Sequence, residues 1–201
     1  VFCTVALNAG EKVATCSTVA IDDIRESYKA VDYLCKKGHK RIAIITGRQS
    51  DSAVGELRTK GYIRALEDNG ITVDPELIRH MPDNIPDFTI RSGYEATKQL
   101  LADGVDFTAL YVIADLSAFG AYKAIAEAGK SIPDDYSVIG FDGLEMTEFM
   151  NPALTTVQQP KEKLAKSAID LLMKQIDSKD AATEQLTYDA ELLEQDSVRE
   201  I

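Results

Sequence analysis

The sequence predicts an α/β protein in which a parallel sheet lies between two layers of helices. From Arg41 onward, short apolar runs rich in β-branched residues alternate with longer stretches of helical period, which is the pattern of successive βαβ units. A residue able to take positive φ ends each of four helical stretches and turns the chain toward the next strand. These residues are Gly38, Gly70, Gly104 and Gly129.

The elements follow in chain order. Strands are predicted at 41–46, 77–81, 108–114 and 137–141. Apolar stripes at a spacing near 3.6 residues, running from Ile24 to Leu34 and from Ile90 to Leu101, predict helices that face a common core. Pro160 opens a further helix, and a polar loop over 178–184 separates it from a last strand near 185–190.

Composition limits the functions that this chain can have. Of its 201 residues 45% are hydrophobic and 27% are charged, so the chain can bury a substantial core. No apolar run approaches the roughly 18 residues that span a bilayer, and we expect no membrane partner. The net charge of -11 argues against direct binding to nucleic acid, which needs clustered Lys and Arg.

The cysteines and histidines do not predict a metal site or a cofactor. Cys3, Cys16 and Cys35 are odd in number and show no CxxC spacing, so we interpret them as buried reduced thiols of a cytoplasmic protein, with a redox or metal site as the alternative. Only His39 and His80 are present, which disfavours a zinc site. We interpret His39, between a helix and a strand, as structural.

Polar and aromatic side chains follow the predicted strands at one edge of the sheet. In open α/β sheets, ligands bind outside the carboxyl ends of the strands. A guanidinium, carboxylates and an aromatic plane suit a polar ring such as a sugar or a nucleobase. The four candidates, one after each strand, are Arg58, Phe88, Asp115 and Asp142.

Each candidate also has a purely structural interpretation. Asp115 stands at a helix start and could be an N-cap, and Phe88 could be a hydrophobic staple. Arg58 alone could be a solvated charge, and Asp142 could accept backbone hydrogen bonds in a turn. Their convergence at one edge favours a ligand site.

Motifs for catalysis are not found. No GxGxxG follows a strand, no GxxxxGK[ST] occurs, and no Ser, His and Asp are placed as in a nucleophile elbow. We therefore predict that the chain binds a ligand and is not an enzyme.

Four runs of residues stand in order along the chain: GHKRIA at 38–43, RTKGY at 58–62, IPDDYSVIGFD at 132–142 and PALTTVQQP at 152–160. The run ELLEQDSV at 191–198 follows them. Together they resemble the signature of the LacI/GalR family of bacterial transcription regulators, and the likeness extends from about Val19 to Ser197.

The resemblance implies a type I periplasmic-binding-protein-like domain of two Rossmann-like lobes, one nearly complete here and the other partial. Residues 1–20 would end the first lobe and form a crossover, and 21–156 would form the second lobe. Residues 157–187 would return to the first lobe, and 188–201 would form the final crossover and the C-terminal segment. A helix-turn-helix domain, absent from this chain, would bind operator DNA.

The resemblance also implies roles for particular residues. Arg58 and Asp142 match ligand-binding positions of the family, and Phe88 matches an aromatic placed against the ligand. Asp115 matches the acidic half of an Asn-Asp pair whose Asn is replaced here by Ala114, and Lys161 occupies a further position facing the pocket.

The family forms homodimers, and the resemblance places four apolar side chains at that interface, with completion of the monomer core as the alternative. These are Phe119, Tyr122, Phe149 and Met150.

The resulting hypothesis is an effector-sensing domain, in which a sugar-like or nucleoside-like ligand between the lobes changes operator affinity. The identity of the ligand, and whether it acts as inducer or co-repressor, stay open. A periplasmic sugar-binding protein of a transport system and a Rossmann-like enzyme are the competing hypotheses.

Overall fold

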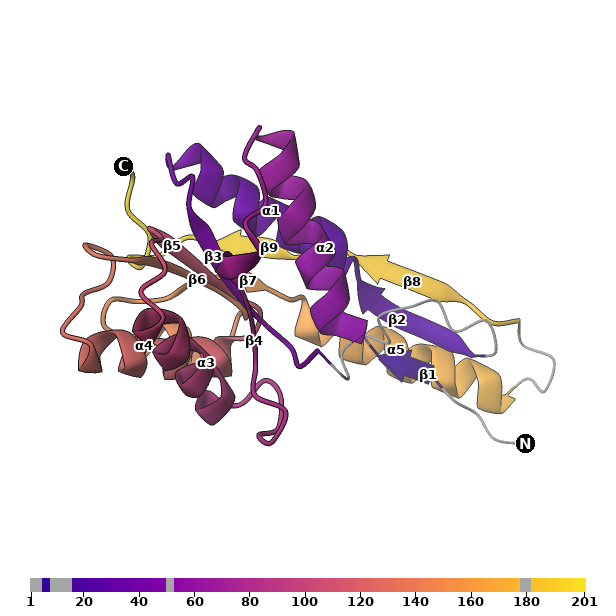
Figure 1. Ribbon diagram of the computed structural model, residues 1–201. Helices are drawn as coiled ribbons and strands as arrows, with labels where there is room; N and C mark the ends of the chain where they lie inside the picture. Colours follow the sequence, from indigo (N-terminus) through magenta and orange to yellow (C-terminus); the bar gives the residue numbers. More distant parts are fainter. Residues whose placement is uncertain (1–4, 8–15, 50–52, 178–181) are drawn as a thin grey trace.

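The computed structural model describes residues 5–7, 16–49, 53–177 and 182–201, which form two β-sheets and five α-helices (Figure 1). The strands are β1 (Val5–Leu7), β2 (Ser17–Ile21), β3 (Ile42–Thr46), β4 (Ile78–His80), β5 (Ala109–Val112), β6 (Ser137–Asp142), β7 (Thr155–Gln158), β8 (Gln185–Tyr188) and β9 (Glu191–Leu193). The helices are α1 (Asp23–Lys36), α2 (Ala53–Asp68), α3 (Ile90–Ala102), α4 (Asp115–Glu127) and α5 (Lys161–Asp177). Two short 3₁₀ helices are η1 (Pro75–Leu77) and η2 (Glu145–Phe149).

The larger sheet has six strands in the order β4-β3-β5-β6-β7-β9. All neighbouring strands in it are parallel except β7 and β9, which are antiparallel. Helices α1 and α2 cover one face, and α3 and α4 cover the other (Figure 1). The predicted three-layer α/β class is therefore confirmed.

The smaller sheet has three parallel strands in the order β1-β2-β8, and α5 packs beside it (Figure 1). Within the described residues, the chain passes between the two sheets three times. The crossovers lie after β2, after β7 and between β8 and β9. The residues in and next to these crossovers lie beside the candidate site.

The four predicted strands of the larger sheet are confirmed as β3, β4, β5 and β6, with ends that shift by one or two residues. The last strand near 185–190 is confirmed as β8. All four glycines predicted to end helices have positive φ, between 69° and 97°. Strands β7 and β9 were not predicted as separate strands, because their runs are short and carry no clear alternation.

The predicted apolar face of α3 is confirmed only in part, because Thr97 is buried and Leu101 packs against the core, whereas its first residue is not buried. Ile90 is 49% exposed, whereas the face that is buried contains Gly93, Ala96 and Leu100. A Cβ on Gly93 would lie 2.1 Å from the Ser117 carbonyl oxygen, so this glycine lets α3 approach α4 backbone to backbone. A search for apolar residues does not detect such a face, because its contact residues are small.

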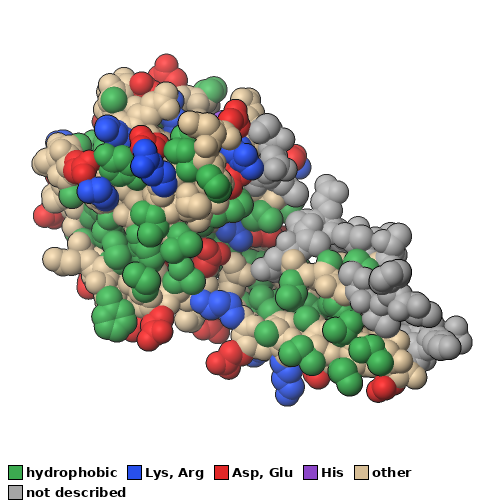
Figure 2. All heavy atoms as spheres, turned by 90° about the horizontal axis from the view of Figure 1, so that it is seen from below, with side chains coloured by type: hydrophobic (Ala, Val, Ile, Leu, Met, Phe, Trp, Pro, Cys, Tyr) green, Lys and Arg blue, Asp and Glu red, His purple; other side chains and the backbone are tan. Residues whose placement is uncertain are grey.

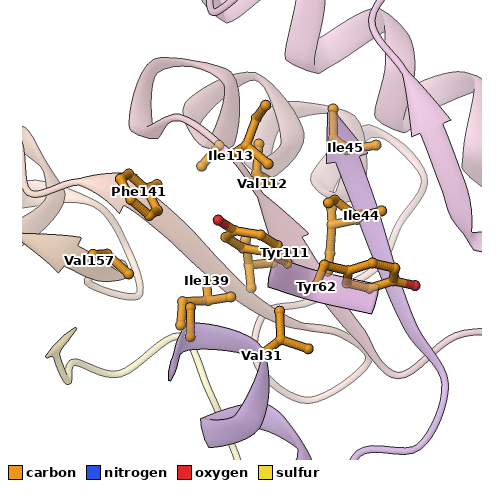
Figure 3. Packing of buried hydrophobic residues seen from close by; sticks show 14 of the residues in the cluster. Val31, Ile44, Ile45, Tyr62, Tyr111, Val112, Ile113, Ile139, Phe141 and Val157 are labelled. Carbon is orange, nitrogen blue, oxygen red and sulfur yellow. The ribbon is translucent and has the colours of Figure 1, made fainter. Parts of the chain in front are cut away.

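The core of the larger sheet is built from β-branched and aromatic side chains on both faces. Figure 3 shows Val31 of α1 and Tyr62 of α2 beside Tyr111 and Ile139, which project from β5 and β6. The Tyr111 hydroxyl is buried and lies 2.7 Å from Ser27 Oγ. Pairing of these buried hydroxyls satisfies groups that would otherwise destabilise the core.

The C-terminal segment covers the amino-terminal ends of the strands of the larger sheet. We call this side of the sheet its amino edge, and the side with the carboxyl-terminal ends of the parallel strands its carboxyl edge. Ser197 Oγ donates to the Val138 carbonyl (2.6 Å) and accepts from the Thr155 amide (2.8 Å). His39 is fully buried, with Nδ1 2.9 Å from Thr108 Oγ1 and Nε2 3.1 Å from a backbone carbonyl of the same segment. These contacts confirm that His39 is structural.

Candidate ligand-binding site

Arg58 lies on α2 with its guanidinium held on three sides. Its Nε donates to Asp23 Oδ1 (2.8 Å), and its Nη1 donates to the Ile113 carbonyl at the end of β5. The guanidinium carbon lies 3.6 Å from the centroid of the Phe141 ring. The side chain is only 6% exposed, so Arg58 is not the solvated charge of the alternative interpretation.

Asp142 ends β6 beside Arg58. Its Oδ1 lies 3.8 Å from Arg58 Nη1 and accepts a hydrogen bond from Gln159 Nε2 (2.8 Å). Burial raises the pKa of Asp142, while the charge of Arg58 and the Gln159 hydrogen bond act in the opposite direction. Its backbone has φ 125°, a strained conformation for a residue with a Cβ, and such strain is frequent at ligand sites.

Lys161 begins α5, directly after the crossover that leaves β7. Its Nζ donates to the carbonyl of Gly143, the residue after Asp142. The side chain is exposed, so it can also face a ligand. The structure thus brings Arg58, Asp142 and Lys161 together at one sheet edge.

Phe88 precedes α3 and has φ 59°. Its ring is partly buried against the core, and its amide donates to Met81 Sδ (3.4 Å). Thr89 caps α3, which places Gly93 where a staple would need an apolar partner. A glycine cannot supply that partner, so the staple interpretation is not supported.

Asp115 is fully buried and does not present a free oxygen to the edge. Its Oδ1 accepts from Thr156 Oγ1 (2.6 Å), and its Oδ2 accepts from the Leu144 amide (2.8 Å). Burial raises its pKa to about 7. Ala114 occupies the N-cap position, so Asp115 is not an N-cap. The two hydrogen bonds of Asp115 connect α4 to the loop after β6 and to β7.

Two further residues of the site were missed by sequence reasoning. Asp23, the first residue of α1, is 3% exposed and pairs with Arg58. Gln159, in the crossover after β7, binds Asp142. The two contacts join residues that are 35 and 17 positions apart in the sequence, so no local pattern signals them.

The four predicted interface residues divide into two groups. Phe119 and Tyr122 are each 8% exposed and belong to the monomer core, which is the alternative given above for the predicted interface residues. The Tyr122 hydroxyl donates to the Pro152 carbonyl (3.2 Å). Met150 is partly buried against that core, whereas Phe149 is 79% exposed. Figure 2, seen from below the view of Figure 1, shows hydrophobic side chains gathered on the side of the molecule that carries α3 and α4.

The remaining predictions concern cysteines, metals and membranes. Cys16 and Cys35 are free, and burial raises the pKa of the Cys35 thiol to about 11; Cys3 lies outside the described residues. No cluster of His, Cys, Asp or Glu in the described ranges could hold a metal ion. Likewise, none of the described helices is both long enough and apolar enough to cross a bilayer.

Comparisons with known proteins identify the family of this chain. Residues 31–198 match the model of the periplasmic binding protein-like domain. The chain is 36% identical over 182 residues to the HTH-type transcriptional repressor CytR of Escherichia coli K12, covering 90% of this chain and 52% of that protein. It thus spans about half the length of the curated relatives it matches.

Two solved structures are also similar. A LacI family transcriptional regulator from Enterococcus faecium with bound ribose has a TM-score of 0.86 and 29% identity, covering 98% of this chain and 70% of that chain. A sugar-binding LacI family regulator from Escherichia coli, complexed with phosphate, has a TM-score of 0.83 and 31% identity, covering 97% and 68%.

The two sheets, the three crossovers and the family-model match define an α/β domain of the periplasmic-binding-protein-like class. Within that class, the chain belongs to the LacI family of transcriptional regulators.

Proposed function

We propose that this chain is the effector-sensing domain of a LacI-type DNA-binding transcriptional regulator. The observation that carries the proposal is the pairing of Arg58 with Asp142 at the carboxyl edge of the larger sheet. Arg58 is hydrogen-bonded to Asp23, next to the first crossover, and Asp142 is hydrogen-bonded to Gln159, in the second crossover. A ligand that binds this pair therefore acts on the connections between the two sheets, where a change in lobe orientation begins.

The proposed ligand is a sugar or a nucleoside-like molecule. Arg58 and Lys161 would donate hydrogen bonds, Asp142 would accept them from hydroxyls, and Phe88 would stack on an apolar face of the ring. Asp115 would support these groups from below by holding the loop after Asp142. We place the second lobe at residues 21–156 and the partial first lobe in the smaller sheet.

The partners and the location are part of the same proposal. Operator DNA would be bound by a helix-turn-helix domain outside these residues, and the protein would act as a cytoplasmic homodimer. Exposed apolar side chains beside α4 and η2 favour a dimer contact there. These are Ile90, Leu116, Met146 and Phe149.

Two measurements on the full-length regulator test this function. A thermal-shift screen of pentoses, hexoses, disaccharides and nucleosides should return at least one compound that raises the melting temperature. That compound should then change the affinity for the operator, measured by fluorescence anisotropy. A stabilising compound that leaves operator affinity unchanged, or that is turned over, would favour a transport protein or an enzyme instead.

A further inference from the structure

The charge of Arg58 is neutralised within the chain. Asp23 supplies a carboxylate 2.8 Å from Arg58 Nε, and the two side chains are 3% and 6% exposed. Asp23 opens α1 directly after the first crossover, so this carboxylate belongs to the wall of the site. An ion pair buried to this degree is little screened by salt.

The hydrogen-bonding capacity of Arg58 is also partly used. Its Nε and Nη1 already donate to Asp23 and to the Ile113 carbonyl, and the Phe141 ring covers one face of the guanidinium. Among the described residues, no acceptor is hydrogen-bonded to Nη2. Phosphate and carboxylate ligands are held best by two parallel N–H donors of one arginine, and the Nε side of that fork is taken.

The other charges of the site do not add a surplus of positive charge. Lys161 is the second cation, and its Nζ donates to the Gly143 carbonyl. Asp142 lies beside it and offsets it, and the buried Asp115 carboxyl lies behind the same loop. The carboxylates of Asp23 and Asp142 therefore match the two cations, Arg58 and Lys161, on this wall.

From this arrangement we propose that Asp23 is a specificity-determining residue, which makes this wall of the site select an uncharged ligand over a phosphorylated or carboxylated one. The inference rests on the proposed effector function, because it concerns the same site. Asp142 Oδ1 lies 3.8 Å from Arg58 Nη1, so the Asp142 carboxylate offers an acceptor beside the donors of the guanidinium. That pair matches adjacent hydroxyls or the edge of a nucleobase, whereas an anion would meet Asp142 without a compensating guanidinium charge.

Inorganic phosphate is the probe that tests the role of Asp23, because it reports on the charge of the site without a known effector. Binding to the full-length regulator is measured by ³¹P line broadening at constant ionic strength. Asp23→Asn keeps an oxygen that can accept from Arg58 Nε but removes the charge. We expect wild type to show no saturable binding up to the highest phosphate concentration tested. Asp23→Asn should bind phosphate saturably, with a Kd at least about ten-fold below that concentration.

Two controls locate the effect. Asp32→Asn removes the same charge from the surface of α1, where Asp32 pairs with Lys36, and it should behave as wild type. Adding Arg58→Gln to Asp23→Asn should abolish the gained binding. Equal phosphate affinity in Asp23→Asn and Asp32→Asn would overturn the role of Asp23. Saturable phosphate binding by wild type, lost in Arg58→Gln, would overturn the preference for uncharged ligands.

A second measurement needs no variant and holds even if Asp23→Asn does not fold. Ribose and ribose 5-phosphate, and glucose and glucose 6-phosphate, are compared by their thermal shifts on wild type. A larger shift from either phosphorylated sugar contradicts the inference. If no compound of the wider screen binds, the sensor function fails, while the phosphate titrations still report whether Asp23 sets the charge preference.

Discussion

The two edges of the larger sheet are built for opposite purposes. At the amino edge, the C-terminal segment satisfies the buried polar groups of the strands through Ser197, and His39 lies fully buried against it. At the carboxyl edge, the Asp142 side chain remains 29% exposed and its backbone is held at φ 125°. One edge is thus closed for stability, and the other keeps strained, hydrogen-bonding groups available to a ligand.

This difference predicts that the free energy of unfolding and the affinity for the proposed ligand can be changed separately within one sheet. Changes at the amino edge should alter the free energy of unfolding without altering ligand affinity. Changes at the carboxyl edge should mainly alter ligand affinity, apart from changes at Asp115, which is buried there for structural reasons, and changes that act on the strained Asp142 backbone. The following variants test that separation.

The largest stability effect is expected for Ser197→Ala at the amino edge. The change leaves the buried Thr155 amide without its acceptor and the Val138 carbonyl without this donor, which should lower the free energy of unfolding by about 2–3 kcal/mol. Urea denaturation measures it. Ser167→Ala, which removes a hydroxyl that lies 2.7 Å from Tyr188 in the other part of the molecule, should lower it by much less. Equal losses in the two variants would contradict the interpretation that the C-terminal segment stabilises the amino edge.

A pH-dependent effect is expected for Asp115→Asn. Because burial raises the pKa of Asp115 to about 7, the folded state holds a proton that the unfolded state releases near pH 4. Wild type should therefore lose on the order of 2 kcal/mol of stability through this group as the pH rises from 5 to 8. Asn does not titrate, so the variant should lack this loss. Parallel stability curves for the two proteins would contradict the assignment.

Backbone strain at Asp142 is measured by comparing Asp142→Gly with Asp142→Ala. Both variants lack the carboxylate, but only glycine accepts φ 125° without strain. We expect the glycine variant to be more stable than the alanine variant by about 1 kcal/mol in urea denaturation. An alanine variant of equal or greater stability would show that this edge is not strained.

The smallest effect is expected for His39→Gln, with the opposite sign to that of Asp115. Burial lowers the pKa of His39, so the folded state favours neutral imidazole. Wild type should lose stability through this group as the pH falls from 7 to 5, because the unfolded chain takes up the proton first. The glutamine variant should not show this loss in thermal melts at the two pH values; if it does, His39 is not the cause.

The sequence predicts those parts of the molecule that follow local rules. Strands β3 to β6 and the glycines that end helices could be predicted because short apolar runs and chain reversals are local features. Arg58 and Asp142 could be predicted as neighbours because the carboxyl ends of parallel strands meet at one edge. The face of α3 could not be predicted, because close packing through Gly93 uses no apolar side chain.

Tertiary contacts explain the rest of what was missed. Asp23 follows Asp22, and only Asp22 caps α1; the second carboxylate turns inward to an arginine 35 residues away. The burial of Phe119 and Tyr122 likewise depends on how α4 packs, which its nearly uniform apolar sequence does not specify.

The most direct test of the account is the affinity of the full-length regulator for the compound that gives the largest thermal shift in the screen. Isothermal titration calorimetry compares wild type with Asp142→Asn at the carboxyl edge and Ser197→Ala at the amino edge. Asp142→Asn should weaken binding about 100-fold, because a buried, charge-assisted hydrogen bond to the ligand is lost. Ser197→Ala should bind as wild type does. Unchanged affinity in Asp142→Asn, or an equal loss in both variants, would contradict the placement of the ligand at the carboxyl edge.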